Sequence, residues 1–87
     1  MVGGHIRIHK LRKEDNLLQC VKGYQDDKAR AVIVINYTNE STLPQDILQS
    51  LVNGIGNFLV GVVPLSVGNE LLDCLQEMFQ DDELYAR

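Results

Sequence analysis

The chain has 87 residues, of which 45% are apolar and 23% charged, as is typical of one small globular domain. A domain of this size buries only about 60–65% of its unfolded surface, so association with another chain would add stability. The net charge of −4, the absence of tryptophan and an aromatic content of 6% argue against a nucleic-acid partner.

The two cysteines, Cys20 and Cys74, are far apart and form no Cys-x-x-Cys pair. This usage favours a reduced chain and therefore a cytoplasmic location. We expect neither a signal peptide nor a membrane span, because no apolar run is long enough to cross a bilayer.

Charge is distributed unevenly along the chain. Residues 1–30 carry seven basic and four acidic side chains, a net charge of +3, whereas residues 31–87 carry one basic and eight acidic side chains, a net charge of −7. Surfaces of opposite sign can steer a partner or pair with each other in an oligomer. The competing interpretation is two solvated faces that serve only solubility.

After a flexible start at residues 1–4, the first expected element is a strand at residues 5–9. Polar and apolar residues alternate there, which predicts Ile6 and Ile8 on the core side and the histidines with Arg7 on the other side. Residues 13–24 follow with apolar residues at helical spacing, which favours an amphipathic helix whose exposed first turn is 12–16. A strand at residues 17–24 remains the alternative.

The sequence Ala-Val-Ile-Val-Ile-Asn-Tyr at residues 31–37 predicts the central strand. Its apolar run is continuous and β-branched, so both faces of the strand should be covered, as in a parallel sheet flanked by helices. Thr42 and Gln45 then match a capping box that opens a helix, with Pro44 in its first turn. Gly54 and Gly56 should end that helix.

The last third of the chain predicts another buried strand and a final helix. Residues 58–63 form a second continuous apolar run closed by Pro64, and Ser66 can cap the helix that follows. That helix should fray near Gln80 because acidic residues are unfavourable at a helix C-terminus, leaving an acidic tail at 81–87. The predicted fold is a small single-domain α/β (or α+β) sheet of three to four strands with two or three helices. Its order is β-α-β-α-β-α, or β-β-β-α-β-α under the strand alternative.

The sequence offers no catalytic constellation. His5 and His9 lie about 13 Å apart on an extended strand, too far to share a metal ion, so we expect no metal site and no cofactor. Both cysteines fall on apolar helical faces, where cysteine is usually a buried hydrophobe. No nucleophile elbow, zinc motif or phosphate loop is present, so an enzyme is disfavoured.

Two clusters are candidates for binding. A small ligand or anion could bind where a strand ends and a helix begins, because helix-terminal N–H groups attract anions there. The residues concerned are Ser66, Gly68, Asn69 and Asn36. The second cluster is a basic patch made of His5, Arg7, His9, Lys10, Arg12 and Lys13.

The preferred functional hypothesis is a non-catalytic protein-interaction or assembly module that binds copies of itself or another protein. The apolar face of the last helix would supply its interaction surface, through Leu72, Leu75, Met78 and Phe79. The alternative is an acidic inhibitor, of the immunity or phage-encoded antagonist type, that binds a basic protein. The acids concerned are Glu40, Asp46, Glu70, Asp73, Glu77, Asp81, Asp82 and Glu83. A third hypothesis is a regulator that binds a small ligand or anion at the Ser66 loop.

Overall fold

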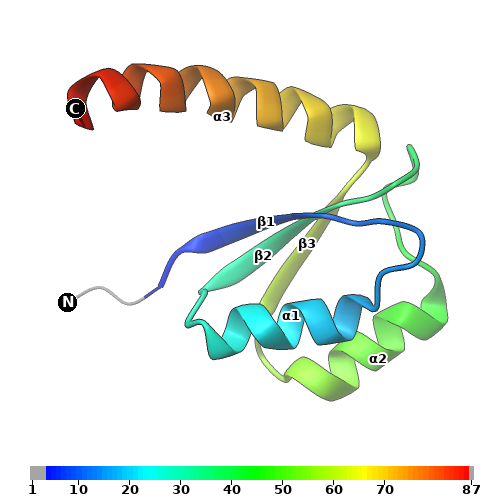
Figure 1. Cartoon of the computed structure of the whole chain (residues 1–87). Coiled ribbons are helices and arrows are strands. Elements are labelled where there is room, and N and C mark those ends of the chain that lie inside the picture. Colours follow the sequence, from blue (N-terminus) through cyan, green and yellow to red (C-terminus); the bar gives the residue numbers. More distant parts are fainter. Residues whose placement is uncertain (1–3, 87) are drawn as a thin grey trace.

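Three parallel strands and three helices alternate along the chain (Figure 1). The computed structural model describes the backbone of residues 4–86 and the side chains of residues 4–77. The elements are β1 (Ile6–Lys10), α1 (Leu17–Asp26), β2 (Ala31–Ile35), α2 (Gln45–Ile55), β3 (Leu59–Val63) and α3 (Leu65–Ala86). The predicted α/β class and the order β-α-β-α-β-α are therefore confirmed.

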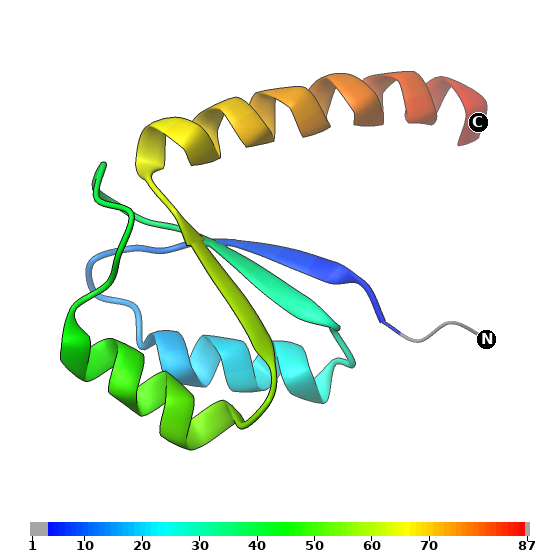
Figure 2. The ribbon, with the colours of Figure 1, turned by 180° about the vertical axis from the view of Figure 1, so that it is seen from behind.

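The sheet has the strand order β1-β2-β3, with both pairs parallel. Figures 1 and 2 show α1 and α2 side by side on one face and α3 on the opposite face. Each of the two βαβ connections is short, so the crossover helices pack on the strands that they join.

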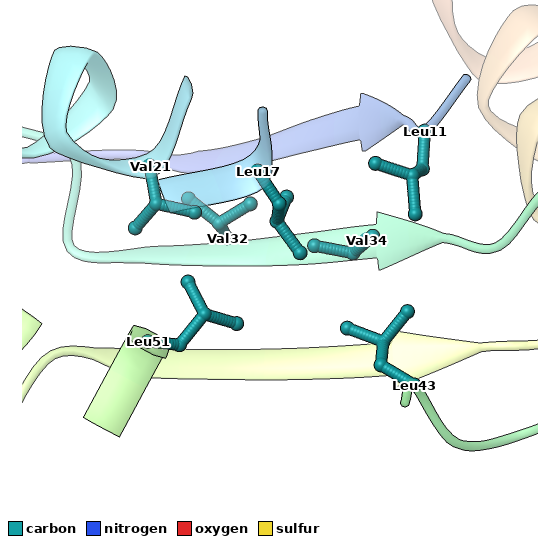
Figure 3. Packing of buried hydrophobic residues seen from close by; sticks show 7 residues of the cluster. All are labelled: Leu11, Leu17, Val21, Val32, Val34, Leu43 and Leu51. Carbon is teal, nitrogen blue, oxygen red and sulfur yellow. The ribbon is translucent and has the colours of Figure 1, made fainter. Parts of the chain in front are cut away.

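The core lies between the sheet and the layer of α1 and α2. Side chains from β2, both helices and two connecting segments meet there (Figure 3). The buried cluster consists of Leu11, Leu17, Val21, Val32, Val34, Leu43 and Leu51. β2 is the central strand, and four of its five residues are buried, as its continuous β-branched run predicts.

Residues 17–24 belong to a helix, so the strand alternative is wrong. Asn16 begins α1, because its side-chain Oδ1 accepts a hydrogen bond from the N–H of Gln19 at 3.2 Å. Residues 12–16 do not form the first helical turn. Their turn is closed instead by the N–H of Asp15, which donates to the carbonyl of Arg12 at 3.0 Å.

The expected capping box of α2 is not formed. The helix begins at Gln45, Pro44 is its N-cap, and no side chain caps it. The backbone of Pro44 is extended, with φ −54° and ψ 147°, and Leu43 before it is buried in the core, so Thr42 lies outside the start of the helix. Gly56 ends α2 with a positive φ of 66°, as expected, but Gly54 lies inside it. A Cβ at Gly54 would lie 2.6 Å from Cδ1 of Leu18, so this glycine allows α1 and α2 to pack closely.

The final strand and helix differ from the prediction in three respects. β3 is an outer strand, and Leu59 within it is 69% exposed rather than buried. α3 begins at Leu65, one residue before the proposed cap Ser66. It also continues to Ala86 instead of ending near Gln80, because the helix propensity of Glu83, Leu84 and Ala86 outweighs the unfavourable acidic end. The acidic tail is therefore helical through residue 86.

The assignment of faces on β1 is also wrong. Arg7 and His9 lie on the sheet face that carries Val32 and Val34, under α1, whereas Ile6 is 62% exposed on the opposite face. The physical reason is that α1 and the loop before it provide Tyr24 and Asp15 as polar partners for this strand. An outer strand in which polar and apolar residues alternate, such as β1, can then direct its polar side chains toward a helix.

Candidate functional site

The loop that follows β2 is held by a buried asparagine. Asn36 is 3% exposed, and its Nδ2 donates to the carbonyls of Glu40 and Thr42 at 3.1 and 3.4 Å. Its Oδ1 accepts from the N–H of Tyr37 at 2.8 Å. The backbone N–H of Asn36 donates to the carbonyl of Val63 at 2.9 Å. Asn36 thus shapes the loop over residues 36–42, and its side-chain amide and backbone N–H are hydrogen-bonded within the chain.

This loop also meets the beginning of α3. The Oδ1 of Asn39 accepts from the N–H of Ser66 at 2.9 Å, and the carbonyl of Thr38 accepts from the N–H of Leu65 at 2.9 Å. These two donors are among the N–H groups that a helix leaves without partners in its first turn. A side chain from another loop therefore caps α3, which reduces what this helix terminus can offer to an anion.

Gly68 is buried where α3 crosses the central strand. A Cβ at this position would overlap Cγ2 of Ile35, whose side chain is itself fully buried. Gly68 therefore serves close packing of helix on sheet, whereas Asn69 beside it is exposed. The structure brings Ser66, Gly68 and the Asn36 loop to one end of the sheet, as expected, and gives each of the first two a contact within the fold.

A second polar cluster, which we call the His9 cluster, joins β1 to α1. It consists of His9, Tyr24, Asp15 and Arg7. Nδ1 of His9 lies 2.7 Å from the hydroxyl of Tyr24, and Nε2 lies 3.2 Å from Oδ2 of Asp15. Because a carboxylate only accepts, Nε2 of His9 carries the hydrogen that it donates to Asp15, and Nδ1 pairs with the Tyr24 hydroxyl.

Arg7 is the fourth member of the His9 cluster, and it contacts the ring of Tyr24 rather than the carboxylate of Asp15. Its guanidinium carbon lies 5.2 Å from the centroid of the Tyr24 ring, at cation–π distance. A shallow open hollow beside it is lined by Arg7, Cys20, Tyr24 and neighbouring residues of α1. The expected basic patch is divided by this arrangement, because Arg7 and His9 lie on one face of the sheet and Lys10 on the other.

The His9 cluster is suited to holding α1 and its leading loop on the sheet. Burial raises the pKa of the Tyr24 phenol above 10.0, its ordinary value, so the hydroxyl remains protonated and is a poor nucleophile. The hydrogen bond from the backbone N–H of Arg12 lowers the pKa of Asp15, and the Arg12 charge and His9 act in the same direction. An ionised Asp15 keeps His9 oriented toward Tyr24.

Replacing Asp15 by Asn should make the free energy of unfolding less dependent on pH in the acidic range. The folded pKa of Asp15 lies below its ordinary value of 3.8, so its stabilising contribution is complete above that pH. It is lost as the pH falls through the lowered folded pKa. We therefore expect Asp15→Asn to be less stable than the wild type at pH 7, with a difference that narrows below about pH 4. Urea unfolding across pH measures this, with Asp73→Asn on exposed α3 as the control; equal pH profiles for all three proteins would contradict it.

Neither a metal centre nor a transmembrane helix is found in the part of the chain that the structure describes. No three His, Cys, Asp or Glu side chains gather there in a metal-binding arrangement. None of its helices combines the length and apolar character that crossing a bilayer requires. Of the eight acidic residues assigned to an inhibitor surface, the five with described side chains are all exposed: Glu40 in the loop after β2, Asp46 on α2, and Glu70, Asp73 and Glu77 on α3.

Apolar side chains are exposed at the side of the molecule formed by β3 and α2. Leu59 of β3 is 69% exposed and Val52 of α2 is 67% exposed. Val52 lies about 200° around the helix from Gly54, which contacts α1, so Val52 is on the side of α2 that faces away from α1. Figure 2 shows β3 and α2 together at this side. We call Val52, Leu59 and the outer edge of β3 the β3 margin.

The structure describes the side chains of only two of the four residues in the expected interaction surface on α3. Leu72 and Leu75 are half-buried, and the side chains of Met78 and Phe79 lie outside the described residues. Sequence patterns missed the β3 margin because a continuous apolar run was taken to require cover on both faces. Sequence patterns also missed Tyr24 and Asp15 as partners of His9, because neither the spacing from His9 to Asp15 nor that from His9 to Tyr24 belongs to a known motif.

The fold and the two polar clusters define a three-stranded parallel α/β domain whose outer strand β3 exposes Leu59 at one margin of the sheet. No family model, curated protein or solved structure matches the chain.

Proposed function

We propose that this chain is a small, non-catalytic protein-interaction module that acts by self-assembly. The observation that carries the proposal is the β3 margin, where an outer strand and the adjoining helix expose Leu59 and Val52. These two side chains lie along the same margin of the molecule on opposite faces of the sheet, and exposed apolar side chains along one margin of a small domain are typical of protein-binding surfaces. The short chain adds a second reason, because one copy has a limited core and gains stability from association.

The two polar clusters support a binding role over a catalytic one. Hydrogen bonds within the fold engage Asn36, Asn39, the Ser66 N–H and the His9 ring. Their geometry connects loops and helices to the sheet and holds the scaffold on which the β3 margin is displayed. The partner favoured by this surface is a second copy of the chain, since the exposed residues are apolar and carry no charge to select a partner of opposite sign.

Size-exclusion chromatography with light scattering tests this proposal. We expect a mass of at least twice that of one chain at micromolar concentrations, with dissociation on dilution. The association should persist at high salt because its surface is apolar. A monomeric mass at every concentration would overturn self-assembly as the function.

A further inference from the structure

The two edges of the sheet differ in charge, and only one of them is protected against pairing. β1 carries the basic residues Arg7 and Lys10, and charged residues on an outer strand discourage contact between edges. β3 reads Leu-Val-Gly-Val-Val and carries no charge. Proline is also absent from it, and Pro64 follows only after its last residue. An uncharged outer strand presents unpaired backbone groups that can accept a further strand.

The hydrogen bonds of β3 show which backbone groups face outward. The carbonyl of Val63 accepts from Asn36, so residues 59, 61 and 63 direct their backbone groups toward β2. Because the direction alternates along a strand, the N–H and C=O groups of Val60 and Val62 point to the open edge. Two identical strands can use all of these groups if they run antiparallel and Val60 of each faces Val62 of the other.

We propose that two copies of the chain pair antiparallel through β3, across a twofold axis at Gly61, to form one six-stranded sheet. This inference rests on the proposed self-assembly and specifies its interface. The register places Leu59 opposite Val63 and Val60 opposite Val62, so every cross-strand pair is apolar. Gly61 faces its own copy at a non-hydrogen-bonded position, where strands approach most closely. A Cβ at Gly61 meets no atom of its own chain within 4 Å.

The exposed valine of α2 provides an independent reason for the same interface. A twofold axis perpendicular to the sheet keeps α2 of both copies on the same face, one on each side of the axis. Val52 lies on the side of α2 away from α1, and a second copy paired through β3 would approach from that side. The pairing therefore covers Leu59 and Val52 together, the two most exposed large apolar side chains among the described residues.

Cysteine cross-linking tests the register directly. In a background in which Cys20 and Cys74 are replaced by Ser, Gly61→Cys would place two cysteines opposite each other, with Cα atoms about 4.5–5.5 Å apart and within disulfide range. Leu59→Cys is the matched control, because its copies would lie about 13 Å apart along the ladder. Under mild oxidation on a non-reducing gel, we expect Gly61→Cys to form a covalent dimer at least about tenfold faster than Leu59→Cys.

The outcomes separate the interface from the proposed function. Equal cross-linking of both variants would overturn the register. If Gly61→Cys does not cross-link although light scattering shows a dimer, pairing through β3 is wrong and self-assembly stands. If light scattering shows a monomer for the wild type and both variants, self-assembly and this interface both fail. Gly61→Lys provides a second measurement, because it puts like charges opposite each other at the axis. It should weaken dimerisation about tenfold or more, whereas Ile6→Lys on the other outer strand should not.

Discussion

Gly68→Val should destabilise the domain by about 3 kcal/mol, because the added side chain enters space that Ile35 occupies. A Cβ at this position already overlaps Cγ2 of Ile35, and Ile35 is fully buried, so its side chain cannot move aside into solvent. The start of α3 would have to lift from β2. Its hydrogen bonds to the loop at residues 38–39 would then be lost as well.

Chemical denaturation followed by circular dichroism measures this effect. Gly61→Val is the matched control, since it adds the same side chain to a glycine with open space around it. The control should unfold at the wild-type denaturant concentration or above it, because valine suits a strand better than glycine. Equal stability of Gly68→Val and the wild type would contradict the close packing of α3 on β2.

Asn36→Asp should also cost about 3 kcal/mol at pH 7. The amide of Asn36 donates to the carbonyls of Glu40 and Thr42 from a nearly inaccessible position. A carboxylate keeps the acceptor for the Tyr37 N–H but loses both donations and places negative charge against two carbonyl oxygens. Burial of that charge adds to the cost, so the variant should recover part of its stability as the pH falls and the carboxyl becomes protonated.

Asn39→Asp is the matched control for this substitution. Asn39 is exposed, and its Oδ1 accepts from the N–H of Ser66 at the start of α3. Aspartate retains this acceptor and adds a negative charge that a helix N-terminus favours. We expect stability equal to the wild type or slightly higher. If both variants were equally destabilised, the distinct role of the buried Asn36 amide would be wrong.

The arrangement of strands and helices could be predicted because hydrophobic pattern and turn residues acted locally. The β-branched run at residues 31–35 forms the buried central strand, and the residues after Asn16, whose apolar side chains recur at helical spacing, form a helix. Faces and caps could not be predicted in the same way. Ile6 and Leu59 are apolar but exposed, because burial depends on whether a neighbour covers the strand. The capping box at Thr42 does not form because Pro44 is extended and α2 begins only at Gln45.

The sequence could predict where the candidate sites lie in the fold but not which residues contact each other there. The end of β2 and the start of α3 do meet, as parallel topology requires. The hydrogen bond from the Ser66 N–H to Oδ1 of Asn39 joins residues 27 positions apart, and the local sequence carries no signal for that pairing. The same holds for His9 and Tyr24, which are separated by 15 positions and meet only because α1 returns across β1.

Residue-resolved hydrogen exchange tests the central claim, self-assembly through β3, most directly. The amides of Val60 and Val62 point away from β2 on one edge, and those of Ile6 and Ile8 point away from it on the other. Pairing through β3 predicts that Val60 and Val62 become protected as protein concentration rises, whereas Ile6 and Ile8 exchange rapidly throughout. Rapid exchange of Val60 and Val62 at a concentration where the protein is dimeric would contradict the claim.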